Sequence, residues 1–274
     1  MKGSAMLELK ERFIYNGQSV AWGCMGTGDP IILIHGFPWS SQAWRNIAPW
    51  LANSHKVYYF DMLGTGQSEK RADQNVSESV QSDLLAALVG EWGLHAPQVV
   101  GHDFGGLCAL RGHFINGLAY RKLHLINCVA VLPSGSPFYA HVAQYEPAFS
   151  GLPAYAHEAL FRAYIQAAAH HPLREEAIQT YLAPWTGADG QGAFYLQIAQ
   201  ADRSNIAEAQ AKYQAPDFDV HLTWGMRDTF IPPAQGREIE AALGAKSFTP
   251  IPDAAHLVQE DAPAALLGAL LARI

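Results

Sequence analysis

The chain has few of the features that mark secreted, membrane-spanning or metal-binding proteins. Its three cysteines, Cys24, Cys108 and Cys128, are odd in number and widely spaced, with no C-x-x-C pair and no cysteine–histidine cluster of metal-ligand spacing. No run approaches about 18 consecutive apolar residues. The first residues also lack a basic stretch that leads into an apolar segment. We therefore expect a cytoplasmic protein with no metal site and no membrane segment.

The charge and length of the chain indicate a compact protein that acts on a small molecule. The 274 residues include 25 acidic and 18 basic side chains, for a formal net charge of -7, and show no lysine and arginine run. Nucleic acid and anionic membrane are therefore poor partners. Hydrophobic residues make up 49% of the chain, enough for a sizeable core. We expect a small apolar organic substrate and water as partners; no pattern indicates an oligomeric state.

Strand and helix patterns alternate in the first 134 residues and again from residue 216. An Asn16-Gly17 turn predicts a hairpin. The predicted strands are residues 7–15, 18–25, 30–34, 56–60, 98–101, 122–131, 220–224 and 247–251. Helical patterns occupy residues 40–51, 80–92 and 105–119, and two more follow Pro232 and Pro263. This order predicts an α/β fold, with a mostly parallel sheet and helices on both faces.

The segment 135–215 differs in character from the rest of the chain. It is rich in alanine, tyrosine, histidine and glutamine and shows mainly helical patterns, with no pattern of a buried strand. We therefore predict a core formed by residues 1–134 and 216–274 and a helical cap, or lid, formed by residues 135–215. The active site is expected between the two.

An aspartate occupies the centre of a predicted strand-to-helix turn. The segment Gly101-His102-Asp103-Phe104-Gly105 follows an apolar strand. It has the pattern of a nucleophile elbow, in which glycines relieve crowding around an exposed side chain on a strained backbone. Most hydrolases built in this way have a serine at this position. An aspartate favours attack on a saturated carbon, which forms an ester between the protein and the substrate.

Four further motifs occur in register with this turn. They are His35-Gly36-Phe37-Pro38, Asp61-Met62-Leu63-Gly64-Thr65-Gly66-Gln67-Ser68, Trp224-Gly225-Met226-Arg227-Asp228 and Ala255-His256-Leu257-Val258-Gln259-Glu260-Asp261. Together with the elbow they make nearly the whole chain resemble the α/β-hydrolase family, and this resemblance implies the α/β-hydrolase fold. Within the family, the aspartate at the elbow resembles the branch of epoxide hydrolases and haloalkane dehalogenases.

The resemblance implies catalytic roles for three side chains. Asp103, Asp228 and His256 satisfy the family's order of nucleophile, acid and histidine along the chain. Asp103 would attack as a carboxylate, and His256 would activate water against the resulting ester. Asp228 would orient His256 and stabilise its charged form. The backbone N–H groups of Phe37 and Phe104 would form the oxyanion hole, and no cofactor is required.

Two leaving groups stay open, an epoxide oxygen and a halide. Family epoxide hydrolases donate to the epoxide oxygen from a pair of cap tyrosines, and Tyr195 is the expected lid tyrosine in this chain. Dehalogenases hold the halide with N–H donors, including a tryptophan directly after the nucleophile, where this chain has Phe104. Trp39 and Trp185 could supply an indole N–H and are expected to contact the substrate. Opening of epoxides to diols is the first expectation, and haloalkane or haloacid dehalogenation is the alternative.

A third alternative is a non-catalytic or slow ligand receptor on the same fold, because a fold does not by itself determine function. The intact candidate triad favours catalysis over this alternative. An esterase or lactonase is disfavoured because attack by a carboxylate on an ester would form a reactive anhydride.

Overall fold

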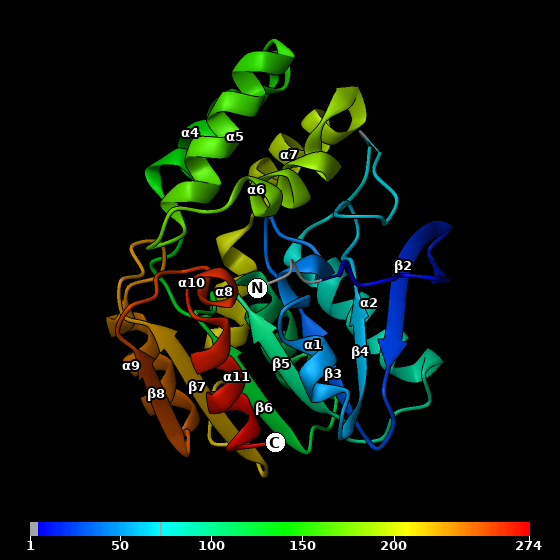
Figure 1. The fold of residues 1–274 in the computed structure, drawn as a ribbon, viewed down its shortest axis with the longest axis vertical. Coiled ribbons are helices and arrows are strands. Elements are labelled where there is room, and N and C mark those ends of the chain that lie inside the picture. The colour runs from blue at the N-terminus through cyan, green and yellow to red at the C-terminus, as the bar shows by residue number, and fades with distance from the viewer. Residues whose placement is uncertain (1–4, 72) are drawn as a thin grey trace.

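An eight-stranded sheet forms the centre of the computed structural model, which describes residues 5–71 and 73–274 (Figure 1). The strands are β1 (Glu11–Tyr15), β2 (Gln18–Met25), β3 (Asp29–Ile34), β4 (His55–Phe60), β5 (Gln98–His102), β6 (Lys122–Ile126), β7 (Asp219–Gly225) and β8 (Ser247–Ile251). Their spatial order is β1-β2-β4-β3-β5-β6-β7-β8. β2 pairs antiparallel with β1 and β4, and the remaining pairs are parallel. The predicted α/β fold with a mostly parallel sheet is confirmed.

Helices cover both faces of the sheet because side chains of the central strands alternate between two apolar cores. Ile31 and Leu33 of β3 belong to the core on one face, and Ile32 and Ile34 to the core on the other. The first core also includes residues of α1 (Ala48–Leu51) and α11 (Pro263–Leu271). The second includes residues of α2 (Glu78–Glu91), α3 (Phe104–Phe114) and α9 (Pro233–Leu243).

Several predicted elements differ in their bounds from those in the structure. β1 begins at Glu11 rather than residue 7, and α3 ends at Phe114 rather than residue 119. The segment 40–51 is a 3-10 helix over Ser41–Trp44 followed by the short helix α1, rather than one continuous helix. Pro49, at the start of α1, has no backbone N–H to continue a helix that begins before it. β6 ends at Ile126 instead of continuing to residue 131, because Asn127 turns the chain with a φ of 39°.

Five helices in the described chain lie between β6 and β7. They are α4 (Pro137–Ser150), α5 (Ala154–Ala167), α6 (Glu175–Leu182), α7 (Gly187–Gln200) and α8 (Arg203–Gln210). Figure 1 shows α4 to α7 beyond the edge at which the parallel strands end. Their apolar side chains form a third core that also includes Phe37, Trp39 and Leu257. α8 packs instead against α3, where Arg111 donates to the Asn205 carbonyl at 2.7 Å.

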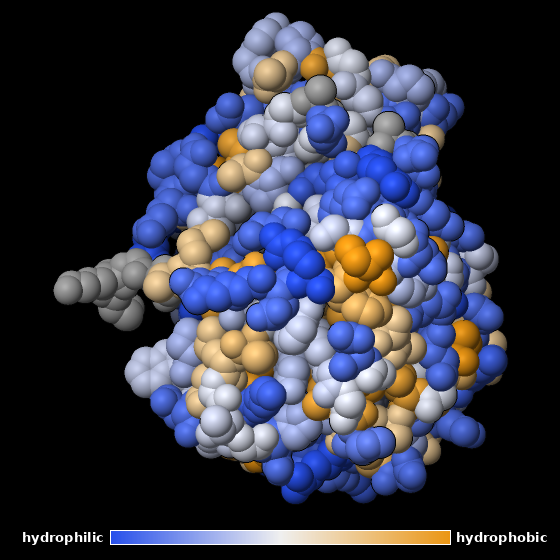
Figure 2. All heavy atoms as spheres, turned by 90° about the vertical axis from the view of Figure 1, so that its right-hand side faces the viewer, coloured by the Kyte–Doolittle hydropathy of each residue, from blue (hydrophilic) through white to orange (hydrophobic). Residues whose placement is uncertain are grey.

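The face of the molecule in Figure 2 is mostly hydrophilic, with apolar side chains in small patches between polar ones. Within residues 5–71 and 73–274, no helix combines the length and the apolar character needed to cross a membrane. The same ranges contain no group of three or more histidine, cysteine, aspartate or glutamate side chains placed to hold a metal ion. Side chains that could perform chemistry gather instead where the parallel strands end, beneath α4 to α7.

Candidate active site

Asp103 occupies the tight turn between β5 and α3. Its backbone has φ 53° and ψ -126°, a conformation that is rare for residues other than glycine. Neighbouring glycines make room for the turn: a Cβ at Gly36 would lie 2.3 Å from Asp103 Oδ2, and one at Gly105 would lie 2.4 Å from the Ile34 carbonyl oxygen. The turn therefore fixes the Asp103 carboxylate at the carboxyl ends of the strands, as a nucleophile elbow does.

The two carboxylate oxygens of Asp103 have different partners. Oδ2 accepts a hydrogen bond from the backbone N–H of Phe37 at 2.9 Å. Oδ1 lies 3.5 Å from Nε2 of His256. The backbone N–H of Phe104, the second predicted oxyanion donor, belongs to the first residue of α3. A helix leaves its first N–H groups without partners inside the helix, so this group is placed to bind an anion.

Asp228 holds the other side of the His256 ring. Nδ1 of His256 lies 2.9 Å from Oδ2 of Asp228. The second oxygen of Asp228 accepts hydrogen bonds from the backbone N–H groups of Phe230 and Ile231, at 2.7 and 2.9 Å. The structure therefore brings Asp103, His256 and Asp228 together, with the His256 ring between the two carboxylates.

The two carboxylates determine the charge of His256. Burial lowers the pKa of His256, but Asp228 and Asp103 outweigh this effect and raise it to about 10. Burial raises the pKa of the Asp228 carboxyl. The charge of His256 and the hydrogen bond from its ring lower this pKa by more, so the pKa of Asp228 lies below its usual value. His256 is therefore protonated at neutral pH. Neutralising Asp103 would lower the pKa of His256.

Asn127 completes the site, although no sequence motif indicated it. It follows β6, and its Nδ2 donates to Oδ2 of Asp228 at 2.6 Å. Its Oδ1 accepts the backbone N–H of Gly225 at 2.8 Å. The available signal was a polar side chain at the carboxyl end of a predicted parallel strand. Asn127 therefore fixes the acid relative to the end of β7.

His102 connects the elbow to the His256 loop. Its Nε2 lies 2.9 Å from the backbone carbonyl oxygen of His256, and the two ring centroids are 4.9 Å apart. Burial and the charge of His256 lower the pKa of His102 to about 4. His102 is therefore neutral, and its Nε2–H donates to the carbonyl.

A largely aromatic pocket, here called the reaction pocket, lies over Asp103. Its lining includes Phe37, Asp103, Phe104, Tyr139, Tyr164, Phe230 and His256. Tyr139 comes from α4 and Tyr164 from α5. Burial raises the pKa of both phenols, and the Asp103 carboxylate raises both further. Two neutral phenols therefore share this pocket with the carboxylate.

Tyr195, the predicted lid tyrosine, does not line the reaction pocket. Its side chain is fully buried, and its hydroxyl lies 2.9 Å from Nδ1 of His157. The preceding residue on α7, Phe194, packs toward Phe37 with ring centroids 5.2 Å apart. Adjacent residues on a helix point about 100° apart, so only one of the two can face the elbow. The structure thus places Tyr139 and Tyr164 in the lining of the reaction pocket and corrects the expected position of Tyr195.

The two tryptophans expected to contact the substrate also lie outside the lining of the reaction pocket. Nε1 of Trp185 donates to the Pro38 carbonyl at 2.8 Å. Trp39 packs edge to face against Tyr181, and its buried Nε1 has no hydrogen-bond partner in the described part of the chain. Both side chains are only 1% exposed, because they join the third core. Neither indole N–H is therefore placed to hold a halide over Asp103.

Comparisons with known proteins identify the family. A profile of the alpha/beta hydrolase fold matches residues 29–111. A solved alpha/beta hydrolase fold protein from Burkholderia ambifaria is 48% identical, with a TM-score of 0.97 over 99% of this chain and 100% of that chain. The chain therefore belongs to the α/β-hydrolase fold family, and the resemblance inferred from its motifs is confirmed.

Two curated relatives carry names that match the two expected leaving groups. The soluble epoxide hydrolase of Corynebacterium sp. (strain C12) is 31% identical over 129 residues, which are 47% of this chain and 45% of that protein. A haloalkane dehalogenase of Sphingobium indicum is 42% identical over 123 residues, which are 41% of this chain and 42% of that protein. The matched segments span less than half of either relative.

Proposed function

We propose that this protein is a hydrolase that opens epoxides to diols through a covalent ester on Asp103. The observation that carries the proposal is the set of groups that surround the Asp103 carboxylate. One oxygen accepts the Phe37 N–H, the other faces His256, and two neutral phenols share its pocket. The name of the Corynebacterium relative supports the same reaction.

The first step is attack by Oδ1 of Asp103 on an epoxide carbon. The bond between that carbon and the ring oxygen breaks, and the oxygen takes a proton from Tyr139 or Tyr164. An alkoxide is far more basic than a phenolate, so this transfer is favourable even though burial raises the pKa of both phenols. Oδ2 stays on the Phe37 N–H and becomes the carbonyl oxygen of the ester.

The second step is hydrolysis of that ester. The ester carries no charge, so the Asp103 carboxylate no longer raises the pKa of His256. His256 can then release its proton, and this proton restores the phenol. His256 then takes a proton from a water molecule that attacks Cγ of Asp103. The N–H groups of Phe37 and Phe104 stabilise the tetrahedral oxyanion. Its collapse breaks the bond between Cγ and Oδ1, and the departing alkoxide takes the proton from His256 and leaves as the diol. The new carboxylic acid returns its proton to His256, which restores the Asp103 carboxylate.

In this proposal the helical segment 135–215 acts as the cap. α4 and α5 supply Tyr139 and Tyr164, while residues 1–134 and 216–274 supply the carboxylates and the histidine. An active site divided in this way needs the cap in place for the leaving group to be protonated. Water and substrate would therefore meet the nucleophile only beneath the cap.

Dehalogenation is the second candidate, because a haloalkane dehalogenase is 42% identical over 123 residues of the chain. The same carboxylate could displace a halide from a saturated carbon. Such an enzyme needs N–H donors for the departing anion, and the N–H of Trp185 is bonded to Pro38. The phenols in the pocket suit an oxygen that must be protonated, which supports the epoxide as substrate.

Trapping of the ester tests the proposal. A His256→Ala variant should attack the substrate but fail to hydrolyse the ester, so intact-mass measurement should show the full mass of an epoxide added at Asp103. An Asp103→Ala/His256→Ala variant is the matched control and should show no added mass. Adducts from haloalkanes alone would favour the second candidate. No adduct from either panel, with an Asp103→Ala variant as active as the parent, would overturn the mechanism.

A further inference from the structure

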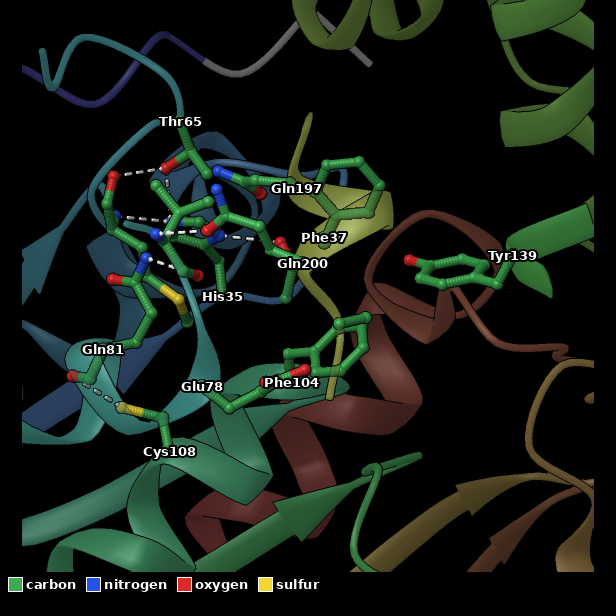
Figure 3. Close-up of a pocket in the computed structure, with 14 residues that line it drawn as sticks. His35, Phe37, Thr65, Glu78, Gln81, Phe104, Cys108, Tyr139, Gln197 and Gln200 are labelled. Atoms are coloured by element: carbon green, nitrogen blue, oxygen red, sulfur yellow. Dashed lines mark hydrogen bonds between the residues drawn. The ribbon is translucent and has the colours of Figure 1, made fainter. Parts of the chain in front are cut away.

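Three cavities meet at the rings of Phe104 and Tyr139. The first is the reaction pocket. The second, here called the side chamber, shares Phe37, Phe104 and Tyr139 with it and extends toward α2 and α7 (Figure 3). The third, here called the mouth, is lined partly by exposed residues of α4 and α8, including Arg203. A molecule entering through the mouth can therefore place one end over Asp103 and the other in the side chamber.

The side chamber has an apolar entrance and a polar wall. Besides the three shared aromatic residues, Met62 and Val76 supply apolar surface. The polar wall consists of Thr65, Glu78, Gln81, Gln197 and Gln200 (Figure 3). A ligand that fills this cavity therefore needs an apolar stretch beside the rings and a polar group at its far end.

Most donor groups of this wall are already bonded to the backbone. Nε2 of Gln81 donates to the carbonyls of Leu63 and Val76. The Thr65 hydroxyl donates to the Met62 carbonyl at 2.8 Å. Gln197 and Gln200 likewise each donate to a backbone carbonyl. The side-chain oxygens of Gln81 and Gln200 also accept backbone N–H groups, from Leu63 and Val76. Glu78 is therefore the charged group of this wall on which recognition of a ligand can depend.

Glu78 supplies the strongest acceptor. It is the first residue of α2 and only 9% exposed. The Asp202 N–H and Asn205 Nδ2 both donate to Oε2, at 3.3 and 3.0 Å. Neither of these two bonds involves Oε1, and Figure 3 shows the side chain extending toward Phe104. Burial raises the pKa of Glu78, although hydrogen bonds from its own backbone N–H, Asp202 and Asn205 oppose this effect.

We propose that the side chamber binds the non-reacting end of the substrate, and that Glu78 selects substrates whose far end carries a hydroxyl or ammonium group. The proposal rests on the proposed function, since attack by Asp103 defines the reacting end. A donor on the substrate satisfies Oε1 of Glu78, whereas a methyl group leaves it buried and unpaired. A carboxylate at the far end is repelled.

A matched substrate series tests this selection. Straight-chain 1,2-epoxides of one length, ending in methyl, hydroxyl, ammonium or carboxylate, are compared by kcat/KM. The parent should prefer the hydroxyl over the methyl end by about three- to tenfold, and the ammonium end by more. Glu78→Gln can keep its hydrogen bonds to Asp202 and Asn205 through Oε1. It then presents an N–H to the chamber, so the preference for ammonium should disappear.

Glu91→Gln is the matched control. It makes the same change of side chain at the other end of α2, where Glu91 is exposed and does not line the side chamber. This variant should keep the parent's ratio of hydroxyl to methyl substrate. A hydroxyl-to-methyl ratio near one in the parent, or an unchanged ammonium-to-methyl ratio in Glu78→Gln, overturns the proposal, while adducts on Asp103 still support the proposed function.

Direct binding separates this inference from the chemistry at Asp103. Calorimetry with 1-hexanol and 1-hexylamine needs no turnover, so it applies even if no epoxide forms an adduct. Tighter binding of 1-hexylamine to the parent than to Glu78→Gln supports the side chamber as a donor-selective subsite, whereas 1-hexanol can form a hydrogen bond with either side chain. Equal affinities of the two proteins for 1-hexylamine overturn the proposal.

Discussion

Nε2 of His102 donates to the backbone carbonyl of His256 at 2.9 Å, so the strand that leads into Asp103 also holds the loop that carries His256. The two residues are 154 positions apart in the chain. This bond positions the His256 loop relative to the elbow, and the contact between the two rings adds to it. Under the proposed reaction, one strand therefore positions both the nucleophile and the base.

Removing this bond should slow the second half of the reaction more than the first. His102→Phe keeps an aromatic ring but lacks the donor, and a base displaced by a fraction of an ångström loses about ten- to a hundredfold in rate. We expect the ester on Asp103 to accumulate in single-turnover experiments followed by intact mass. His102→Gln, which can donate from an amide, should recover part of the rate. Equal slowing of both steps would argue against a positioning role.

The phenols of Tyr139 and Tyr164 should matter for epoxides specifically. The double variant Tyr139→Phe/Tyr164→Phe keeps the ring volumes and removes both proton donors, so kcat for epoxides should fall about 10²- to 10⁴-fold. Tyr195→Phe is the matched control, because its hydroxyl lies against His157 outside the reaction pocket. A loss in the control without a loss in the double variant would restore Tyr195 as the lid tyrosine.

The charge of His256 should make stability depend on pH. Its pKa in the folded protein is about 10, above the ordinary histidine value of 6.5, so protonation stabilises the fold fully below pH 6.5. This contribution is lost as the pH rises through 10. Urea unfolding of the parent and of His256→Gln at pH 6 and pH 10 measures it. The difference between the two free energies of unfolding should shrink by at least about 1.4 kcal/mol, the equivalent of one pKa unit.

Asn127 should contribute to both stability and hydrolysis. Asn127→Gly removes its two hydrogen bonds without straining the positive φ, and leaving Asp228 and Gly225 short of a partner should cost about 1–3 kcal/mol of unfolding free energy. Asn127→Ala should cost more, because alanine is also strained at this φ. Ester hydrolysis should slow in both variants. Urea unfolding and single-turnover rates that match the parent would show that Asn127 is dispensable.

The fold and the central residues of the candidate site could be predicted from the sequence because each lies where a strand ends. Asp103 follows the β5 pattern, Asp228 follows β7 and His256 follows β8, so a parallel sheet places them at one edge. Asn127 lies at the end of β6 in the same way. No sequence motif includes Asn127, and only the folded structure shows that its amide contacts Asp228.

The cap could not be predicted to the same depth. Its helices were expected, but the face that each turns toward the elbow depends on how they pack together. The pattern suggested Tyr195, yet the helix turns Phe194 toward Phe37 and leaves Tyr195 with His157. Tyr139 and Tyr164 belong to different helices, and no spacing in the sequence brings them together. The hydrogen bond from the Trp185 indole N–H to the Pro38 carbonyl likewise depends on how the helices pack.

The two carboxylate oxygens of Asp103 have different partners, and this difference has a chemical consequence for the protein itself. Under the proposed reaction, Oδ1 becomes the oxygen that joins the substrate, and cleavage at Cγ sends it away with the diol. Water then replaces it on the side facing His256, while Oδ2 never leaves the Phe37 N–H. In each turnover the protein thus loses one of its own oxygen atoms to the product. An oxygen atom from water takes its place, without rotation of the side chain.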